Sequence, residues 1–123
     1  MSKYGNNKVI VDGIKFDSKL EARRYIELKL LEKAKIIKDL NLQVPFELIP
    51  SYKKNGKTIR AAKYIADFVY YDNEKEKQII EDTKGFKTEE YKLKKKLFEY
   101  KYRDLEITEI YKDGVRKWLN QKL

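Results

Sequence analysis

The spacing of apolar residues along the first third of the chain predicts a hairpin followed by a helix. Residues 9–16, "VIVDGIKF", read as two short strands around an aspartate–glycine pair that favours a two-residue turn. The next segment, 17–36, has the charge and apolar spacing of a long amphipathic helix, with Asp17 or Ser18 as its N-cap. The chain therefore opens with a small β element and a helix.

The middle of the chain is dominated by β-branched and aromatic residues, which favour strands. Pro45 lies in the first of these runs and indicates an edge strand or a bulge. The pattern predicts a strand over 42–50 and then a basic turn over 51–58, built on an asparagine–glycine pair. A long strand over 58–72 should follow, joined by a polar turn over 72–77 to an antiparallel partner strand over 78–85.

The last third predicts a second helix over 88–104, capped by Thr88 and carrying acids in its first turn. A short strand over 105–110 and a short terminal helix over 115–123, anchored by Trp118, should follow. With 123 residues and no linker or repeat, we expect one domain spanning residues 1–123. The order of elements predicts a mixed α/β fold around a small sheet.

The charge balance changes this picture by suggesting a partner. Lys and Arg number 29 against 20 acids, which gives a net charge of +9. A basic domain of this size suggests a polyanion, most commonly nucleic acid. The alternative is a solubilising surface with a lysine-rich bias, and the charge alone does not separate the two.

Two absent residue types narrow the chemistry. The sequence has no Cys and no His, which excludes disulfides, thiol catalysis, imidazole bases and His-ligated zinc. Any catalysis must use carboxylates, Lys or Tyr, with a hard cation such as Mg²⁺. We find neither a membrane-length apolar run nor a signal-peptide core, and so expect a cytoplasmic protein without membrane contact.

Asp67, Asp82 and Lys84 form the pattern that points to catalysis. Asp67 interrupts an apolar and aromatic run, and Asp82 stands in the next strand with Lys84 two residues later. A hairpin about residues 73–77 would bring positions summing to about 149 or 150 opposite each other, and 67 and 82 sum to 149. Two carboxylates that close repel each other unless a cation lies between them. Glu81 leaves the register ambiguous, but the lysine spacing favours Asp82.

An aspartate after apolar residues, a gap, and then Asp-x-Lys at a strand end resembles the PD-(D/E)XK nuclease superfamily. The resemblance implies an α/β, restriction-endonuclease-like core of helix, three-stranded antiparallel sheet, helix and strand, here with an N-terminal hairpin and a short C-terminal helix. It further implies that Asp67 and Asp82 hold Mg²⁺, or Mn²⁺ in its place, while Lys84 aligns or activates water. Many members add a glutamate from the first helix, for which Glu21 is the candidate.

The wider run "VDGIKFDSKLEARRY … YIADFVYYD … IIEDTKGFKT" also resembles a small phage and prophage family of undefined function, usually grouped with resolvase-like nucleases. That resemblance implies a structure-selective DNA endonuclease that cuts junctions or branches in phage recombination or replication, in the host cytoplasm. Symmetric cutting of two strands would require a homodimer. The chain departs from the motif at its first letter, because Ala66 replaces the proline.

Each candidate residue also has an ordinary structural interpretation. Glu21 follows Ser18 by three residues, so "SKLE" is also a capping box. Asp67 would be satisfied by an ion pair with Arg60 or Lys63, and Asp82 and Lys84 by a surface pair with each other. At this point these alternatives remain open.

The expected nucleic-acid contacts are lysines and one tyrosine on two elements. In the second helix, beside the expected site, we place Tyr91, Lys94 and Lys95. In the basic turn we place Lys53, Lys54 and Lys57. Lysines give affinity for phosphates without reading sequence. The rival to an endonuclease is a non-catalytic nucleic-acid-binding accessory protein on a nuclease-like fold.

Overall fold

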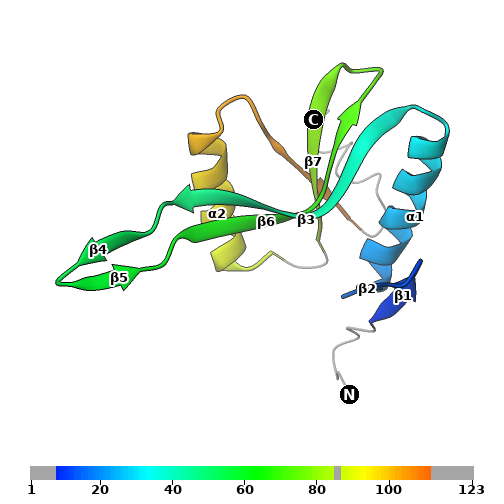
Figure 1. Cartoon of the computed structure of the whole chain (residues 1–123). Helices are drawn as coiled ribbons and strands as arrows, with labels where there is room; N and C mark the ends of the chain where they lie inside the picture. Colours follow the sequence, from blue (N-terminus) through cyan, green and yellow to red (C-terminus); the bar gives the residue numbers. More distant parts are fainter. Residues whose placement is uncertain (1–7, 85–86, 112–123) are drawn as a thin grey trace.

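A computed structural model describes residues 8–84 and 87–111 of the chain. It has a mixed α/β architecture in which two helices accompany a four-stranded sheet and two short hairpins (Figure 1). The elements in chain order are β1 (Val9–Val11), β2 (Ile14–Phe16), α1 (Lys19–Lys33), β3 (Ile37–Ile49), β4 (Tyr52–Lys54), β5 (Lys57–Ile59), β6 (Ala62–Asp72), β7 (Lys77–Thr83), α2 (Glu89–Lys101) and β8 (Ile107–Ile110).

The main sheet has the order β3-β6-β7-β8. β6 pairs antiparallel with both β3 and β7, whereas β8 pairs parallel with β7 after the crossover through α2. β3 is an edge strand in this order, and Pro45, opposite Ile65, occupies the edge position that its missing N–H favours. The register of β6 and β7 pairs Phe68 with Glu81, whose numbers give the predicted sum of 149.

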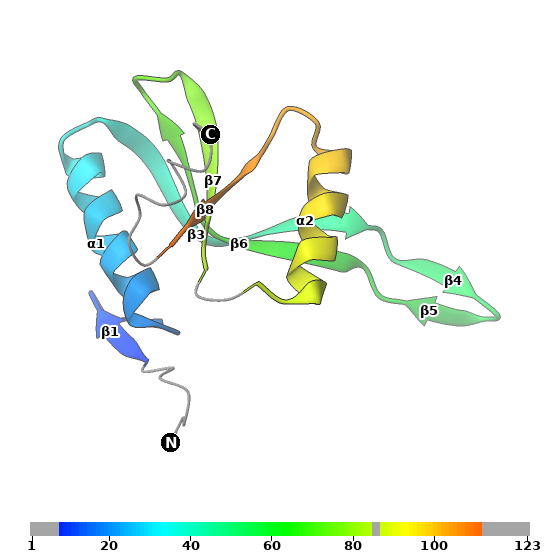
Figure 2. The ribbon, with the colours of Figure 1, turned by 180° about the vertical axis from the view of Figure 1, so that it is seen from behind.

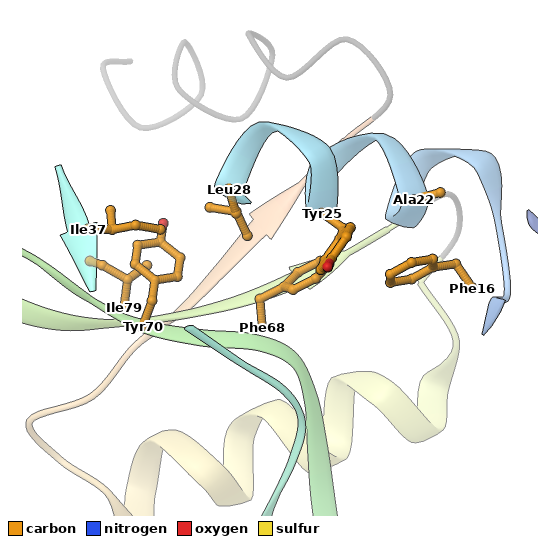
Figure 3. Close-up of a cluster of buried hydrophobic side chains, with 8 residues drawn as sticks. All are labelled: Phe16, Ala22, Tyr25, Leu28, Ile37, Phe68, Tyr70 and Ile79. Atoms are coloured by element: carbon orange, nitrogen blue, oxygen red, sulfur yellow. The ribbon is translucent and has the colours of Figure 1, made fainter. Parts of the chain in front are cut away.

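The helices pack on opposite faces of the sheet. Alternate side chains of a strand point to opposite faces, so Ile79 and Ile80 of β7 enter two different apolar clusters. The α1 cluster, drawn in Figure 3, consists of Phe16, Ala22, Tyr25, Leu28, Ile37, Phe68, Tyr70 and Ile79. The α2 cluster consists of Leu48, Tyr64, Ala66, Val69, Ile80, Tyr91, Phe98 and Ile107.

Both helices begin where the sequence predicts. The Ser18 hydroxyl accepts a hydrogen bond from the Glu21 N–H at 3.1 Å, and the Thr88 hydroxyl accepts one from the Tyr91 N–H at 3.0 Å. α1 ends at Lys33, three residues before the predicted end, because Lys35 adopts a left-handed conformation with φ of 62°. The next element, β3, is 13 residues long and starts five residues earlier than predicted.

The predicted strand over 58–72 is divided into β5 and β6, and the basic turn is itself a hairpin of β4 and β5. Asn55 and Gly56 both have positive φ, as a tight two-residue hairpin turn requires. We call residues 51–60 the arm, because they extend away from both helices in two opposite views (Figures 1 and 2). The predicted terminal helix over 115–123, with Trp118, lies outside the described residues. None of the helices in the described ranges combines the length and the apolar character needed to cross a bilayer.

Candidate active site

The sequence-predicted acids lie at the point where β6 and β7 part. Asp67 directly precedes Phe68 on β6 and Asp82 directly follows Glu81 on β7, and Phe68 and Glu81 are paired. Together with Lys84 they line a cavity of about 300 Å³ between these strands and the start of α2. The remaining lining residues are Tyr64, Ile65, Thr88, Glu90, Tyr91 and Lys94.

Asp82 is a buried carboxylate, with 5% of its surface exposed. Its two oxygens accept from the Tyr64 hydroxyl at 2.7 Å and pair with the Lys84 ammonium at 3.0 Å. Burial, followed by the negative charge of Asp67, raises the pKa of Asp82 to about 6 even though both partners oppose the shift. Asp82 and Lys84 are therefore not the exposed surface pair that the sequence left open.

Lys84 is held between two groups. Its ammonium lies 3.7 Å from the centre of the Tyr91 ring, on the side of the cavity formed by α2, and 3.0 Å from Asp82. Its main-chain N–H donates to the Ile110 carbonyl at 2.7 Å, which ties this end of β7 to β8. The side chain is only 15% exposed, so its position in the cavity is fixed by packing as well as by charge.

Asp67 is half-buried and is positioned by the neighbouring strand. One carboxylate oxygen accepts from the Thr83 N–H at 2.8 Å and from the Thr83 hydroxyl at 2.9 Å. The other oxygen faces the Gln43 amide at 3.4 Å. An ion pair of Asp67 with Arg60 or Lys63 is not found among the described residues.

Glu21 comes to the same place from α1. It is 7% exposed, and one of its oxygens accepts from the Gln43 amide at 3.1 Å. Burial and the charges of Asp67 and Asp17 raise its pKa to about 7, against a backbone hydrogen bond at Asp17. The two interpretations of Glu21 thus coincide, because its N–H completes the Ser18 cap while its carboxylate approaches Asp67.

Gln43 is a site residue that the sequence analysis missed. Its amide nitrogen bridges Glu21 and Asp67, and its backbone has φ of 52°, which is unusual for a non-glycine residue within a strand. Outliers of this kind gather at functional sites. The sequence carries no signal for this conformation, because the segment "LQVPF" shows an ordinary alternation of apolar and polar residues.

Glu81 belongs to the opposite face of β7. Its carboxylate accepts two hydrogen bonds from the Arg24 guanidinium, at 2.8 and 2.6 Å, and one from the Tyr70 hydroxyl. These hydrogen bonds connect β7 to α1 on the face of the sheet opposite the cavity. The register ambiguity between Glu81 and Asp82 is resolved in favour of Asp82 as the residue that faces the cavity.

The carboxylate oxygens at this site are the kind of ligand that a hard divalent cation prefers. Glu21, Asp67 and Asp82 supply only oxygen atoms. Burial first, and the negative charge of Asp67 second, raise the pKa of Glu21 and Asp82, and a bound cation would offset both effects. Across residues 8–84 and 87–111, however, no three His, Cys, Asp or Glu side chains stand close enough together to form a ready-made metal cage. Gln43 instead connects Glu21 with Asp67 through its amide.

The expected nucleic-acid contacts divide into three groups. Lys94 lines the cavity and pairs with Glu90 at 3.1 Å, while Lys95 pairs with Glu99 at 3.6 Å and lines a neighbouring groove. Tyr91 is 8% exposed, and its hydroxyl donates to Glu109 at 2.8 Å, so it supports Lys84 from within the fold. The third group lies on the arm, away from the cavity, and consists of Lys53, Lys54 and Lys57.

Comparison with known families assigns the chain to one of them. The profile of a family described as "Protein of unknown function (DUF1064)" matches residues 1–117. The chain belongs to this family. Searches of curated proteins and of solved structures give no match to this DUF1064 chain.

Proposed function

We propose that this chain is a Mg²⁺-dependent DNA endonuclease that hydrolyses phosphodiester bonds. The observation that carries the proposal is the convergence of Glu21, Asp67 and Asp82, two of them with raised pKa values, beside a lysine held at the cavity wall. Carboxylates with perturbed pKa values beside a cleft are candidates for a functional site. The net charge of +9 suits a polyanionic substrate.

The topology supports the finer fold assignment that belongs to this proposal. From α1 to β8 the chain forms a helix, three antiparallel strands, a helix and a strand parallel to β7. This is the order expected of a restriction-endonuclease-like core. The candidate residues also stand on the elements where the PD-(D/E)XK pattern expects them, namely the first helix and the second and third strands of the core.

In this proposal each side chain has a defined task. Asp67, Asp82 and Glu21 hold the cation, which when bound would polarise the phosphate to be cut. Thr83 and Tyr64 orient the two aspartates by donating to one oxygen of each. Lys84, kept in place by Asp82 and the Tyr91 ring, donates a hydrogen bond to the attacking water or to a phosphate oxygen.

The direct test is a cleavage panel. Duplex, single-stranded, flap and four-way-junction DNA are incubated with the chain in Mg²⁺, Mn²⁺ or EDTA. We expect cleavage that requires the metal and favours a branched substrate, and sedimentation should show a dimer if a junction is cut symmetrically. No cleavage of any substrate by the folded chain would overturn the endonuclease and leave a DNA-binding accessory protein in its place.

Metal binding can be measured without activity. Mg²⁺ should raise the melting temperature at pH 8, where Glu21 and Asp82 are ionised, and much less at pH 5, where protons occupy both carboxylates. Asp67→Asn should abolish the Mg²⁺ effect, while Asp104→Asn, an exposed aspartate far along the chain, should keep it. An equal response of both variants would remove Asp67 from the metal site.

A further inference from the structure

The arm is an unusually exposed and basic piece of structure. Every residue from 49 to 60 is exposed, which includes both strands of the β4–β5 hairpin. Between Leu48 and Ala66 the sequence contains five basic residues and no acid. A two-stranded hairpin without a packed face is marginal by itself in water, so its sequence is not explained by contacts within the domain.

The arm is continuous with the candidate active site. β6 runs from the base of the arm to Asp67, and Ile65 on that strand lines the cavity while remaining 52% exposed. At a rise of about 3.3 Å per residue, the ten residues from Lys57 to Asp67 span up to about 33 Å. Along B-DNA that length corresponds to about ten base pairs, or one helical turn.

The shape of the arm also suits a duplex groove. A two-stranded β-ribbon fits the major groove of B-DNA, which is about 12 Å wide, but not the deep and narrow major groove of A-form RNA. Tyr52 and Ile59 are cross-strand partners near the base of the ribbon, and Lys54 and Lys57 are partners at its tip. The apolar pair can lie against the groove wall while the lysines reach phosphates on either side.

We propose that the arm is a duplex-DNA grip that lies in the groove and holds phosphates about one helical turn from the position cut by the candidate site. The inference rests on the proposed function for the place of the cut, but binding by the arm is measurable without it. Lys53, Lys54 and Lys57 act as point charges, so the grip senses the presence of flanking duplex and not its sequence.

The test uses the whole chain in EDTA, with fluorescence anisotropy on blunt DNA duplexes of about 10 and about 25 base pairs. The arm variant is K53Q/K54Q/K57Q. Its matched control is K33Q/K75Q/K77Q, which removes the same charge from exposed lysines at the other end of the sheet and helix α1. Circular dichroism confirms that both variants are folded.

We expect the arm variant to bind the long duplex at least about tenfold more weakly than wild type does. The slope of log affinity against log salt concentration should also be smaller in magnitude by nearly three. The control should lose much less affinity, and on the short duplex the two variants should behave alike. Equal losses for arm and control variants on the long duplex would overturn the inference. So would an equal effect of the arm variant on duplex RNA, which would favour backbone charge without groove fit.

The same proteins separate this inference from the proposed function. If wild type binds long duplex through the arm but cleaves nothing in Mg²⁺, the endonuclease fails and the grip stands. If wild type cleaves, and the arm variant cleaves and binds long duplex as wild type does, the grip fails and the endonuclease stands.

Discussion

At the scale of single residues, the distinctive feature of the site is that its charged side chains are largely buried. Asp82 and Glu21 are buried, and the negative charge of Asp67 acts on both carboxyl groups. Lys84 compensates part of the negative charge of the site from one side only. Burial, with the charge of Asp67 second, raises the pKa of both carboxyl groups, which is costly for a structural site and useful for one that takes up a cation.

Lys84→Ala separates catalysis from binding. If Lys84 stabilises charge in the transition state, its removal should lower the cleavage rate by roughly 10²-fold. DNA affinity in EDTA should change little, because one lysine is a small part of 29 basic residues. Rates in Mg²⁺ and affinities are measured for this variant and for Lys94→Ala, which removes a lysine from the same cavity. Cleavage at the wild-type rate by folded Lys84→Ala would exclude it from the chemistry.

Gln43 offers a test of backbone strain at the site. Glycine tolerates a φ of 52°, whereas alanine keeps the strain and also loses the amide. Gln43→Gly should therefore be more stable than Gln43→Ala by about 1 kcal/mol, the reverse of their usual order within a strand. Urea denaturation of both variants gives the comparison. Greater stability of the alanine variant would mean that residue 43 relaxes out of the left-handed region.

At the scale of elements, the sequence predicted those features that depend on local signals. Ser18 and Thr88 marked both helix starts, and the apolar runs around Asp67 and Asp82 gave the correct register for β6 and β7. The missed features depend on tertiary structure. The early start of β3 follows from pairing of Ile37 with Asp72, 35 residues later, and no local pattern carries that information.

The same distinction explains the site. Asp67 and Asp82 stood out because acids are rare in apolar strands, and Glu21 because the nuclease resemblance implies a glutamate from the first helix. Gln43 reaches the site only through an unusual backbone angle, and the role of Tyr91 depends on its burial under Lys84. These two properties arise from packing between elements and leave no local trace.

Glu109 links β8 to α2 and makes their contact sensitive to acid. Burial would raise its pKa, but hydrogen bonds from Lys87, Tyr91 and Tyr111 outweigh burial and lower the pKa to about 2. A carboxylate with a lowered folded-state pKa stabilises the fold above its unfolded value of 4.5, and the stabilisation is lost as the pH falls toward 2.

Glu109→Gln should consequently lower the free energy of unfolding by about 2 kcal/mol at pH 7, since the shift is partly screened around the exposed Lys87. The gap to wild type should close as the pH falls from 4.5 to 2. Denaturation curves across this range measure it, with Glu106→Gln as the exposed control on the same segment. A gap that stays constant with pH would show that the effect is packing and not charge.

At the scale of the whole molecule, charge and shape act together. The net charge of +9 is spread over both helices and the arm, whereas Asp67 and Asp82 line one cavity and Glu21 lies beside Asp67. Such a surface attracts phosphate backbones over a wide area and leaves a negative centre for a cation to neutralise. In the proposed function this combination would join a sequence-independent binding surface to a small reactive centre.

If the chain binds DNA as proposed, its affinity should fall steeply with added salt and vary little among duplex sequences. Lysines would supply most of the contacts, and no base-reading helix is evident in the described residues. Affinities between about 50 and 200 mM salt, on several unrelated duplexes, test both points. A flat salt response, or a strong preference for one sequence, would contradict an electrostatic mode of binding.

The separation of the apolar interior into an α1 cluster and an α2 cluster means that the two sides of the site are supported separately. Glu21 belongs to the α1 side and the Lys84–Tyr91 contact to the α2 side, while β6 and β7 contribute residues to both clusters. β3 also contributes to both, through Ile37 and Leu48. The carboxylate that comes from α1 and the lysine held against α2 thus depend on different apolar clusters, so a substitution in one cluster should disturb one side of the site more than the other.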